Sequence, residues 1–226
     1  MHKTFSAAWL IARKDLSIEF RTKSAFMASI VFSLLGIVIF YFAWDSTAVT
    51  PADLAPGVLW VIFTFAGLLG LHRSFGVEQE ERAMDALLAA PVERESIFLG
   101  KALANLIFVL AVQAIAIPAV GLFYNLPLAR IVTALFSVAF LAAIGLVVVG
   151  TLFSAMAANT RLAEILLPML ALPFFVPIVI PAAQATARLL GGRPVGEALP
   201  WLKLLAAFDI VFIVACTLAF PFTLED

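Results

Sequence analysis

The chain has 226 residues, of which 64% are hydrophobic and 13% are charged, and its formal net charge is -1. A soluble domain is roughly half apolar and a quarter charged, so this composition indicates a protein whose main solvent is lipid. The small net charge argues against nucleic acid as a partner, because phosphate binding needs a clustered excess of Lys and Arg, and the single cysteine, Cys216, excludes an intramolecular disulfide.

Residues 1–23 are too charged to cross a membrane, yet they carry apolar residues at helical spacing. Phe5, Trp9 and Phe20 fall on one face of such a helix, and Lys14 lies on another. The pattern predicts an N-terminal amphipathic helix in the membrane interface, with its aromatic rings among acyl chains and its cations near lipid phosphates. A basic anchor that only fixes the orientation of the chain explains the same charges equally well.

Six further segments are apolar and long enough to cross the hydrocarbon core, which takes roughly 20 helical residues. The predicted spans are residues 24–44, 57–71, 102–124, 131–156, 164–187 and 203–223. The sequence therefore predicts an all-α integral membrane protein with a single transmembrane domain, residues 1–226. An even number of spans puts both termini on one side of the membrane.

The distribution of Lys and Arg predicts which side that is, because cytoplasmic segments of membrane proteins carry the excess of these residues. With both termini inside, the inner segments hold ten of the fourteen: Lys3, Arg13, Lys14, Arg21, Lys23, Arg73, Arg82, Arg94, Lys101 and Arg161. The outer segments hold Arg130, Arg188, Arg193 and Lys203. The bias predicts cytoplasmic termini, with three of the four outer charges clustered in the last loop.

The most informative hydrophilic segment is residues 76–100, on the cytoplasmic side between the second and third predicted spans. Leu87 and Leu88 share a helical face, and Pro91 ends the helix because it lacks an amide hydrogen and disfavours helical geometry in the residue before it. A short helix with one apolar stripe can dock into a groove of another protein. A solvated loop fits the pattern nearly as well. The charged side chains of the segment include Glu78, Glu80, Glu81, Arg82, Asp85 and Arg94.

The nucleotide-binding motif that ATP hydrolysis would need is missing from this segment. A P-loop requires Gly-x-x-x-x-Gly-Lys followed by Ser or Thr, so that backbone amides can cradle phosphate. Gly100-Lys101 has Glu95 where the first glycine is needed, and Ala102 follows the lysine. If ATP is used, another polypeptide must hydrolyse it.

Residues that could hold haem are also scarce. Axial haem ligands are typically His, Met, Cys or Tyr, and the two histidines are His2 at the N-terminus and His72 at the cytoplasmic end of the second span. His72 fits an interfacial polar residue better than a ligand. Trp44, Trp60 and Trp201 fit membrane-interface anchors. We therefore expect no metal site and no tightly bound cofactor in this chain.

The fifth predicted span contains four prolines, Pro168, Pro173, Pro177 and Pro181. Each proline removes a backbone hydrogen bond, and in lipid the freed carbonyl needs a protein or water partner. A kinked helix that faces a second copy of the chain or a transport pathway would supply such partners. Packing against a neighbouring helix of the same subunit explains the prolines at least as well.

Several motifs resemble known transporter families. Glu80, Leu87-Leu88, Pro91, Arg94 and Gly100-Lys101 occur in the order and spacing of the coupling segment of exporter-type ABC transporter permeases. More narrowly, Ala55-Pro56-Gly57 with Trp60-Val61, then Gly67 to Arg73-Ser74-Phe75, are similar to the CcmB family, the membrane subunit of the haem exporter used in cytochrome c maturation. The prolines of the fifth span and the N-terminal Arg13-Lys14-Asp15 are similar to that family as well, so the resemblance covers nearly the whole chain.

The resemblance implies an ABC-2 exporter-like fold and a homodimer of this chain with two copies of the ATPase subunit CcmA in the bacterial inner membrane. CcmC, CcmD and the haem chaperone CcmE would lie nearby, and ATP would be bound by the partner. Haem, or haem-loaded CcmE, would be what the complex exports or releases. The implied ATPase-coupling residues are Glu78, Glu80, Glu81, Arg82, Asp85, Leu87, Leu88, Pro91 and Arg94. Those implied for a pathway or dimer interface are Trp60, Arg73, Pro168, Pro173 and Pro177.

The rival class is a secondary transporter or channel for another small solute. Such proteins need ionisable groups or unwound helices at mid-membrane, and apart from Asp209 the predicted spans offer few. Asp209 itself is expected near the outer interface, because Lys203 lies close to it in the chain. An intramembrane enzyme is a weaker alternative, since no paired carboxylates or Ser-Lys dyad appear at membrane depth.

Overall fold

The fold is that of a computed structural model that describes residues 2–45, 47–80, 92–158 and 163–224. Its long helices are α1 His2–Thr22, α2 Ser24–Ala43, α3 Pro51–Glu80, α5 Arg94–Phe123, α6 Val132–Ala158, α7 Ala163–Leu190 and α8 Leu199–Ala219. Three short 3-10 helices are η1 Leu128–Arg130, η2 Val195–Glu197 and η3 Phe220–Leu224. Every regular element in the described residues is a helix.

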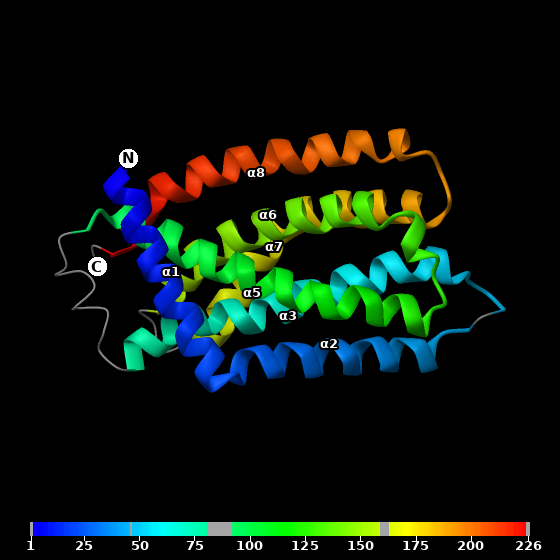
Figure 1. The fold of residues 1–226 in the computed structure, drawn as a ribbon, viewed down its shortest axis with the longest axis horizontal. Helices are drawn as coiled ribbons and strands as arrows, with labels where there is room; N and C mark the ends of the chain where they lie inside the picture. Colours follow the sequence, from blue (N-terminus) through cyan, green and yellow to red (C-terminus); the bar gives the residue numbers. More distant parts are fainter. Residues whose placement is uncertain (1, 46, 81–91, 159–162, 225–226) are drawn as a thin grey trace.

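Six of the helices, α2, α3, α5, α6, α7 and α8, are long and apolar enough to cross a membrane. They run along one bundle, with the N- and C-termini at the same end, which is called the terminal end below; the opposite end is called the far end (Figure 1). This arrangement confirms the predicted all-α membrane fold with six spans. The chain is therefore a multi-pass membrane protein.

The helix bounds differ from the predicted spans mainly at the terminal end. α3 continues from the second span through residues 73–80, and α5 begins at Arg94, before the predicted start at residue 102. Residues 73–80 and 94–101, which the hydropathy pattern placed outside the membrane spans, thus extend α3 and α5. At the far end α5 stops at Phe123, close to the predicted end of the third span at residue 124, and Asn125 adopts a left-handed conformation with a φ of 51°.

α1 runs obliquely across the terminal end of the bundle and packs against α5 (Figure 1). Its buried residues are small or branched: Ala8, Ile11 and Ala12. The predicted aromatic stripe points elsewhere, since Phe5 and Phe20 are 76% and 74% exposed. α1 therefore has two apolar sides, one on α5 and one open to acyl chains, as an interfacial helix requires.

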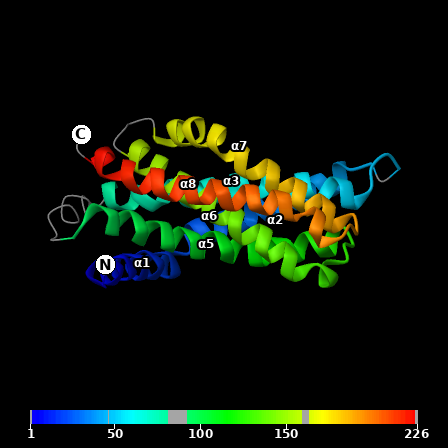
Figure 2. The ribbon, with the colours of Figure 1, turned by 90° about the horizontal axis from the view of Figure 1, so that it is seen from above.

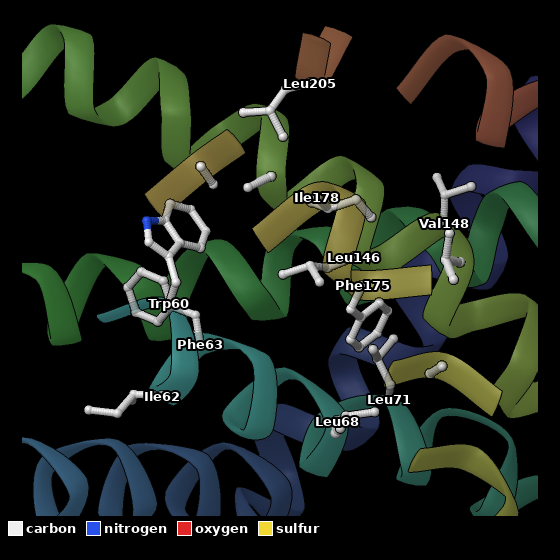
Figure 3. Packing of buried hydrophobic residues seen from close by; sticks show 14 of the residues in the cluster. Trp60, Ile62, Phe63, Leu68, Leu71, Leu146, Val148, Phe175, Ile178 and Leu205 are labelled. Atoms are coloured by element: carbon white, nitrogen blue, oxygen red, sulfur yellow. The ribbon is translucent and has the colours of Figure 1, made fainter. Parts of the chain in front are cut away.

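The core lies where α3, α6 and α7 meet. Trp60 and Phe63 of α3, Leu146 of α6, and Phe175 and Ile178 of α7 point toward one another there (Figure 3). Lipid tails are as apolar as these side chains, so burial alone drives little association of helices within a membrane. Close van der Waals packing and hydrogen bonds between helices must supply the rest.

Small residues bring the spans close together. A Cβ added at Gly150 of α6 would clash with the Leu71 side chain, and one added at Gly70 of α3 would clash with the Phe108 ring. Short polar side chains then reach across these contacts. Ser154 donates a hydrogen bond to the Leu71 carbonyl oxygen at 2.6 Å, and Asn105 Nδ2 donates to Thr151 Oγ1 at 3.0 Å. Such pairs fix the register of the helices where apolar contacts cannot.

The four prolines of the fifth span lie inside one continuous helix, α7. Figure 2 shows that the path of α7 changes direction along its length. Pro173, Pro177 and Pro181 are four residues apart and share a face. Pro173 is exposed, Pro177 is half-buried and Pro181 is buried, so this row runs from the lipid-facing surface into the protein.

Asp209 lies deeper than its sequence neighbours suggested. It is the eleventh residue of α8, about 15 Å from the first at 1.5 Å per residue. It is 4% exposed, and Gly145 of α6 leaves room for it, since a Cβ added there would lie 2.8 Å from Asp209 Oδ1. The expectation of a place near the outer interface was wrong, because α8 begins at Leu199 and not at Lys203.

Candidate functional site

The candidate site is the terminal end of the bundle, where α3 ends, α5 begins and α1 crosses them. Of the predicted coupling residues, Arg94 opens α5, and Glu78 and Glu80 lie in the last turns of α3, where the structure describes only the backbone. The other predicted coupling residues lie outside the described residues: Glu81, Arg82, Asp85, Leu87, Leu88 and Pro91. The apolar stripe on which ATPase docking was predicted therefore stays a prediction.

The first two turns of α5 are held against α1 by a close backbone contact. Gly100 is the point of closest approach, since a Cβ added there would lie 2.7 Å from the Ala8 carbonyl oxygen and 2.8 Å from Ile11 Cβ. Ile97 and Phe98, in the turn before Gly100, are almost fully buried. Any larger residue than glycine would push the two helices apart.

An ion pair lies next to this contact. Lys101 of α5 is fully buried, and its Nζ lies 3.2 Å from Asp15 Oδ2 of α1. The other oxygen of the same carboxylate lies 3.2 Å from Lys14 Nζ. Burying an ammonium group costs several kcal/mol, which a carboxylate in contact offsets. The pair therefore ties α1 to α5 in one register.

Further contacts fix the start of α5 from both chain termini. Thr4 Oγ1 of α1 donates a hydrogen bond to Glu93 Oε2 at 2.8 Å. On the other side, Arg94 Nη1 donates to the Pro221 carbonyl oxygen at 3.0 Å, and the rings of Phe98 and Phe220 lie 5.2 Å apart. The segment that leads from residue 92 into the membrane is thus joined to α1 and to η3. A displacement of this segment would move α1 with it.

The Asp15–Lys101 contact was not predicted, although both residues lie in motifs that resemble transporter families. Arg13-Lys14-Asp15 and Gly100-Lys101 are far apart in the sequence. Lys101 itself indicated that a partner was needed, because a lysine at the start of an apolar span must contact either water or an anion. Nothing in the local pattern identifies an anion 86 positions earlier.

The residues predicted for a pathway or dimer interface do not gather in one place. Trp60 is 1% exposed, and its Nε1 donates a hydrogen bond to Thr186 Oγ1 at 3.0 Å, so it lies in the core and is not a membrane-interface anchor. Arg73 lies in α3, where only the backbone is described. Pro173 is exposed on α7, and Pro168 and Pro177 are half-buried.

Pro168 does line a groove on the surface of the bundle, called the α2–α3–α7 groove below. It has a volume of about 350 Å³ and lies over α3, between α2 and α7; its lining residues are Phe32, Phe65, Leu68, Leu69, His72, Leu167 and Pro168. His72 is the one polar side chain among them. Within the described ranges, no cluster of three His, Cys, Asp or Glu side chains could hold a metal ion.

Comparison with known proteins relates the whole chain to one family. A family model described as "CcmB protein" matches residues 6–226. Among curated proteins, "Heme exporter protein B" of Paracoccus denitrificans is 30% identical over 206 residues, covering 91% of this chain and 89% of that protein. The proteins of the same name from Rhodobacter capsulatus and Pseudomonas aeruginosa are 28% and 27% identical, over 88% and 89% of this chain and 91% and 90% of theirs.

Proposed function

Because this chain belongs to the CcmB protein family, we propose that it is the membrane-spanning permease subunit of an ABC transporter that exports haem, or releases a haem-loaded chaperone, during cytochrome c maturation. The observation that carries the proposal is the family match over residues 6–226, together with relatives named as haem exporters over nine-tenths of their length. The six-span bundle is the architecture that such a subunit needs.

In this function the chain is a non-catalytic partner of an ATPase subunit, CcmA. The missing P-loop is consistent with that division of work. α3 and α5 both reach the terminal end beyond their apolar spans, so the segment between them is the natural docking element for the ATPase. Motion of that segment would enter the bundle through α5, and α1 would follow because Asp15 and Lys101 join the two helices.

The terminal end would face the cytoplasm of a bacterial inner membrane. Arg13, Lys14, Arg21 and Lys23 lie on α1 or directly after it, and cytoplasmic segments carry such an excess of positive charge. An ATPase subunit must also lie where ATP is. Both requirements put the N- and C-termini inside.

The subunit would act as a homodimer, with the α2–α3–α7 groove as its interface. α2 and α7 flank the groove, and only 22% and 33% of their apolar windows are buried, whereas 72% of that of α3 is buried. A second copy related by a two-fold axis would cover Phe32 and Pro168 with the same surface of its own. CcmC, CcmD and CcmE would then bind other faces of this dimer.

The test is to express the full chain with CcmA, CcmC, CcmD and CcmE and to purify it through a tag on this chain. We expect the ATPase to copurify and haem-loaded CcmE to be released when ATP is added. A CcmA variant without its P-loop lysine is the control, because it should stay attached but release nothing. If no ATPase copurifies, and the isolated chain in liposomes takes up solute along a proton gradient, the alternative of a secondary transporter holds.

A further inference from the structure

A second groove lies near the corner at which the chain turns from α1 into α2, and it is called the α1–α5 groove below. It has a volume of about 310 Å³, and its walls are almost entirely apolar. Phe20 comes from α1, Phe26 and Met27 from α2, and Ile107 and Phe108 from α5. The groove thus joins the interfacial helix to two membrane spans, on a surface that acyl chains can reach.

Its two polar residues, Glu19 and Lys23, differ in what they contact. The Glu19 carboxylate accepts a hydrogen bond from the Phe26 amide at 2.8 Å, which caps the first turn of α2. Lys23 is exposed and adopts a left-handed conformation with a φ of 54°, at the junction between the two helices. Within the part of the chain that the structure describes, no carboxylate lies within salt-bridge distance of the Lys23 ammonium group.

Lys23 is the cation in the lining of the groove, and the carboxylate there, Glu19, accepts the Phe26 amide hydrogen. α1 has two acidic residues, and the protein engages both: Asp15 contacts Lys14 and Lys101, and Glu19 caps α2. Arg21 is exposed two residues before Lys23. A ligand with an anionic head and a long apolar body fits an apolar groove that has Lys23 in its lining and Arg21 close by in the chain.

We propose that the α1–α5 groove binds an anionic phospholipid, with an acyl chain between α1, α2 and α5 and the phosphate at Lys23. α1 lies across the end of the bundle while α2 and α5 run along it (Figure 1), so the groove leads from headgroup level into the hydrocarbon. A zwitterionic lipid would fill the same apolar walls but gain less from the Lys23 ammonium group. Binding here goes beyond haem export and does not depend on it.

The test uses the full chain in nanodiscs of phosphatidylcholine that contain a minor fraction of phosphatidylglycerol. Native mass spectrometry of the ejected protein measures how much phosphatidylglycerol stays bound relative to phosphatidylcholine. Each cation at the headgroup should contribute about a fivefold preference. We expect Lys23→Gln to lower the preference for phosphatidylglycerol about fivefold, and Lys23→Arg to retain it.

Lys203→Gln is the matched control, because Lys203 is also exposed and lies at the far end of the bundle in α8. It should leave the preference unchanged. Ala111→Trp places a large ring in the groove and should reduce retention of both lipids, while circular dichroism shows an unchanged helix content.

Three results would overturn the assignment. Lys23→Gln could retain phosphatidylglycerol as the wild type does. Lys203→Gln could lower the preference for phosphatidylglycerol as much as Lys23→Gln does, which would show that the preference follows the net charge of the protein and not the groove. Haem, added to nanodiscs, could displace phosphatidylglycerol from the wild type but not from Ala111→Trp, which would make the groove a substrate site.

Discussion

Asp15 and Lys101, which join α1 to α5, differ in how deeply they are buried. Lys101 is fully buried, whereas the Asp15 side chain keeps 19% of its surface exposed and also contacts Lys14. Removing Asp15 is costly, because the Lys101 charge then stays buried without a partner. Removing Lys101, the buried charge, costs much less stability. The two residues should therefore respond differently to substitution.

We predict that Asp15→Ala lowers the free energy of unfolding by about 3 kcal/mol, near the lower end for a buried pair because Asp15 is partly exposed. Lys101→Met should cost clearly less, and the double variant should be more stable than Asp15→Ala alone. Thermal unfolding of the purified chain in detergent measures the three values. Lys14→Ala, which removes the exposed partner of the same carboxylate, is the control and should cost less than about 1 kcal/mol.

A double variant no more stable than Asp15→Ala would contradict this account. It would mean that Asp15 acts through contacts other than Lys101.

At the scale of elements, α1 and α5 form one joined unit because glycine occurs where their backbones meet. A Cβ at Gly100 would lie 2.7 Å from a backbone oxygen, the Ala8 carbonyl, which cannot rotate away as a side chain could. The same unit supplies part of the apolar wall of the α1–α5 groove, which α2 completes. Its geometry should therefore depend on Gly100 more than on any charge.

We predict that Gly100→Ala separates α1 from α5 and destabilises the chain by about 1–3 kcal/mol, the usual range for overpacking. Gly57→Ala in α3 is the matched control, since nothing lies within 4 Å of the added Cβ. That change should be neutral or stabilising by about 0.5–1 kcal/mol, because alanine is the better helix former. Equal melting temperatures for the two variants would contradict the close contact.

The segment between α3 and α5 allows a prediction about the ATPase. Leu87→Asp or Leu88→Asp puts a charge into the predicted docking stripe, so we expect CcmA to be lost on size-exclusion chromatography while the membrane fold stays intact. Val195→Asp is the control, because Val195 is a half-exposed apolar residue of η2 at the far end. Undiminished attachment in both leucine variants would exclude this stripe as the docking element.

The elements themselves were predictable from the sequence, and their contacts were not. Bilayer thickness fixes the length of a span, so runs of apolar residues locate the six helices. The contact of α1 with α5 uses Ala8, Ile11 and Gly100, whose meaning depends on residues far along the chain. The predicted position of Asp209 was wrong because α8 begins four residues before the predicted span. These four residues add about 6 Å of helix, so the carboxylate lies further from the start of the span.

At the scale of the whole molecule, burial is uneven among the spans. α3 and α6 form the centre, while no more than a third of the apolar window of α2, α5, α7 or α8 is buried. An exposed apolar helix is normal in lipid, so exposure alone does not identify an interface. The α2–α3–α7 groove differs because it is hollowed and is flanked by the proline-rich α7.

A cross-linking experiment tests that groove as the homodimer interface. In a Cys216→Ser background, Phe32→Cys puts a thiol beside the groove, and residues near a two-fold axis meet their own copies. We expect a short bifunctional thiol reagent to give covalent dimers in membranes. Leu218→Cys on exposed α8 is the control and should stay monomeric; the reverse result would move the interface to α8.

The contact between Asp15 and Lys101 also sets an order of events during synthesis. Asp15 leaves the ribosome 86 residues ahead of Lys101, and two spans must enter the translocon in between. Until then α5, the helix against which the N-terminal helix mainly packs, is missing, and the N-terminal helix lies on the bilayer surface. The N-terminal helix therefore docks on the bundle late in biogenesis, only after the third membrane span, α5, has been synthesised.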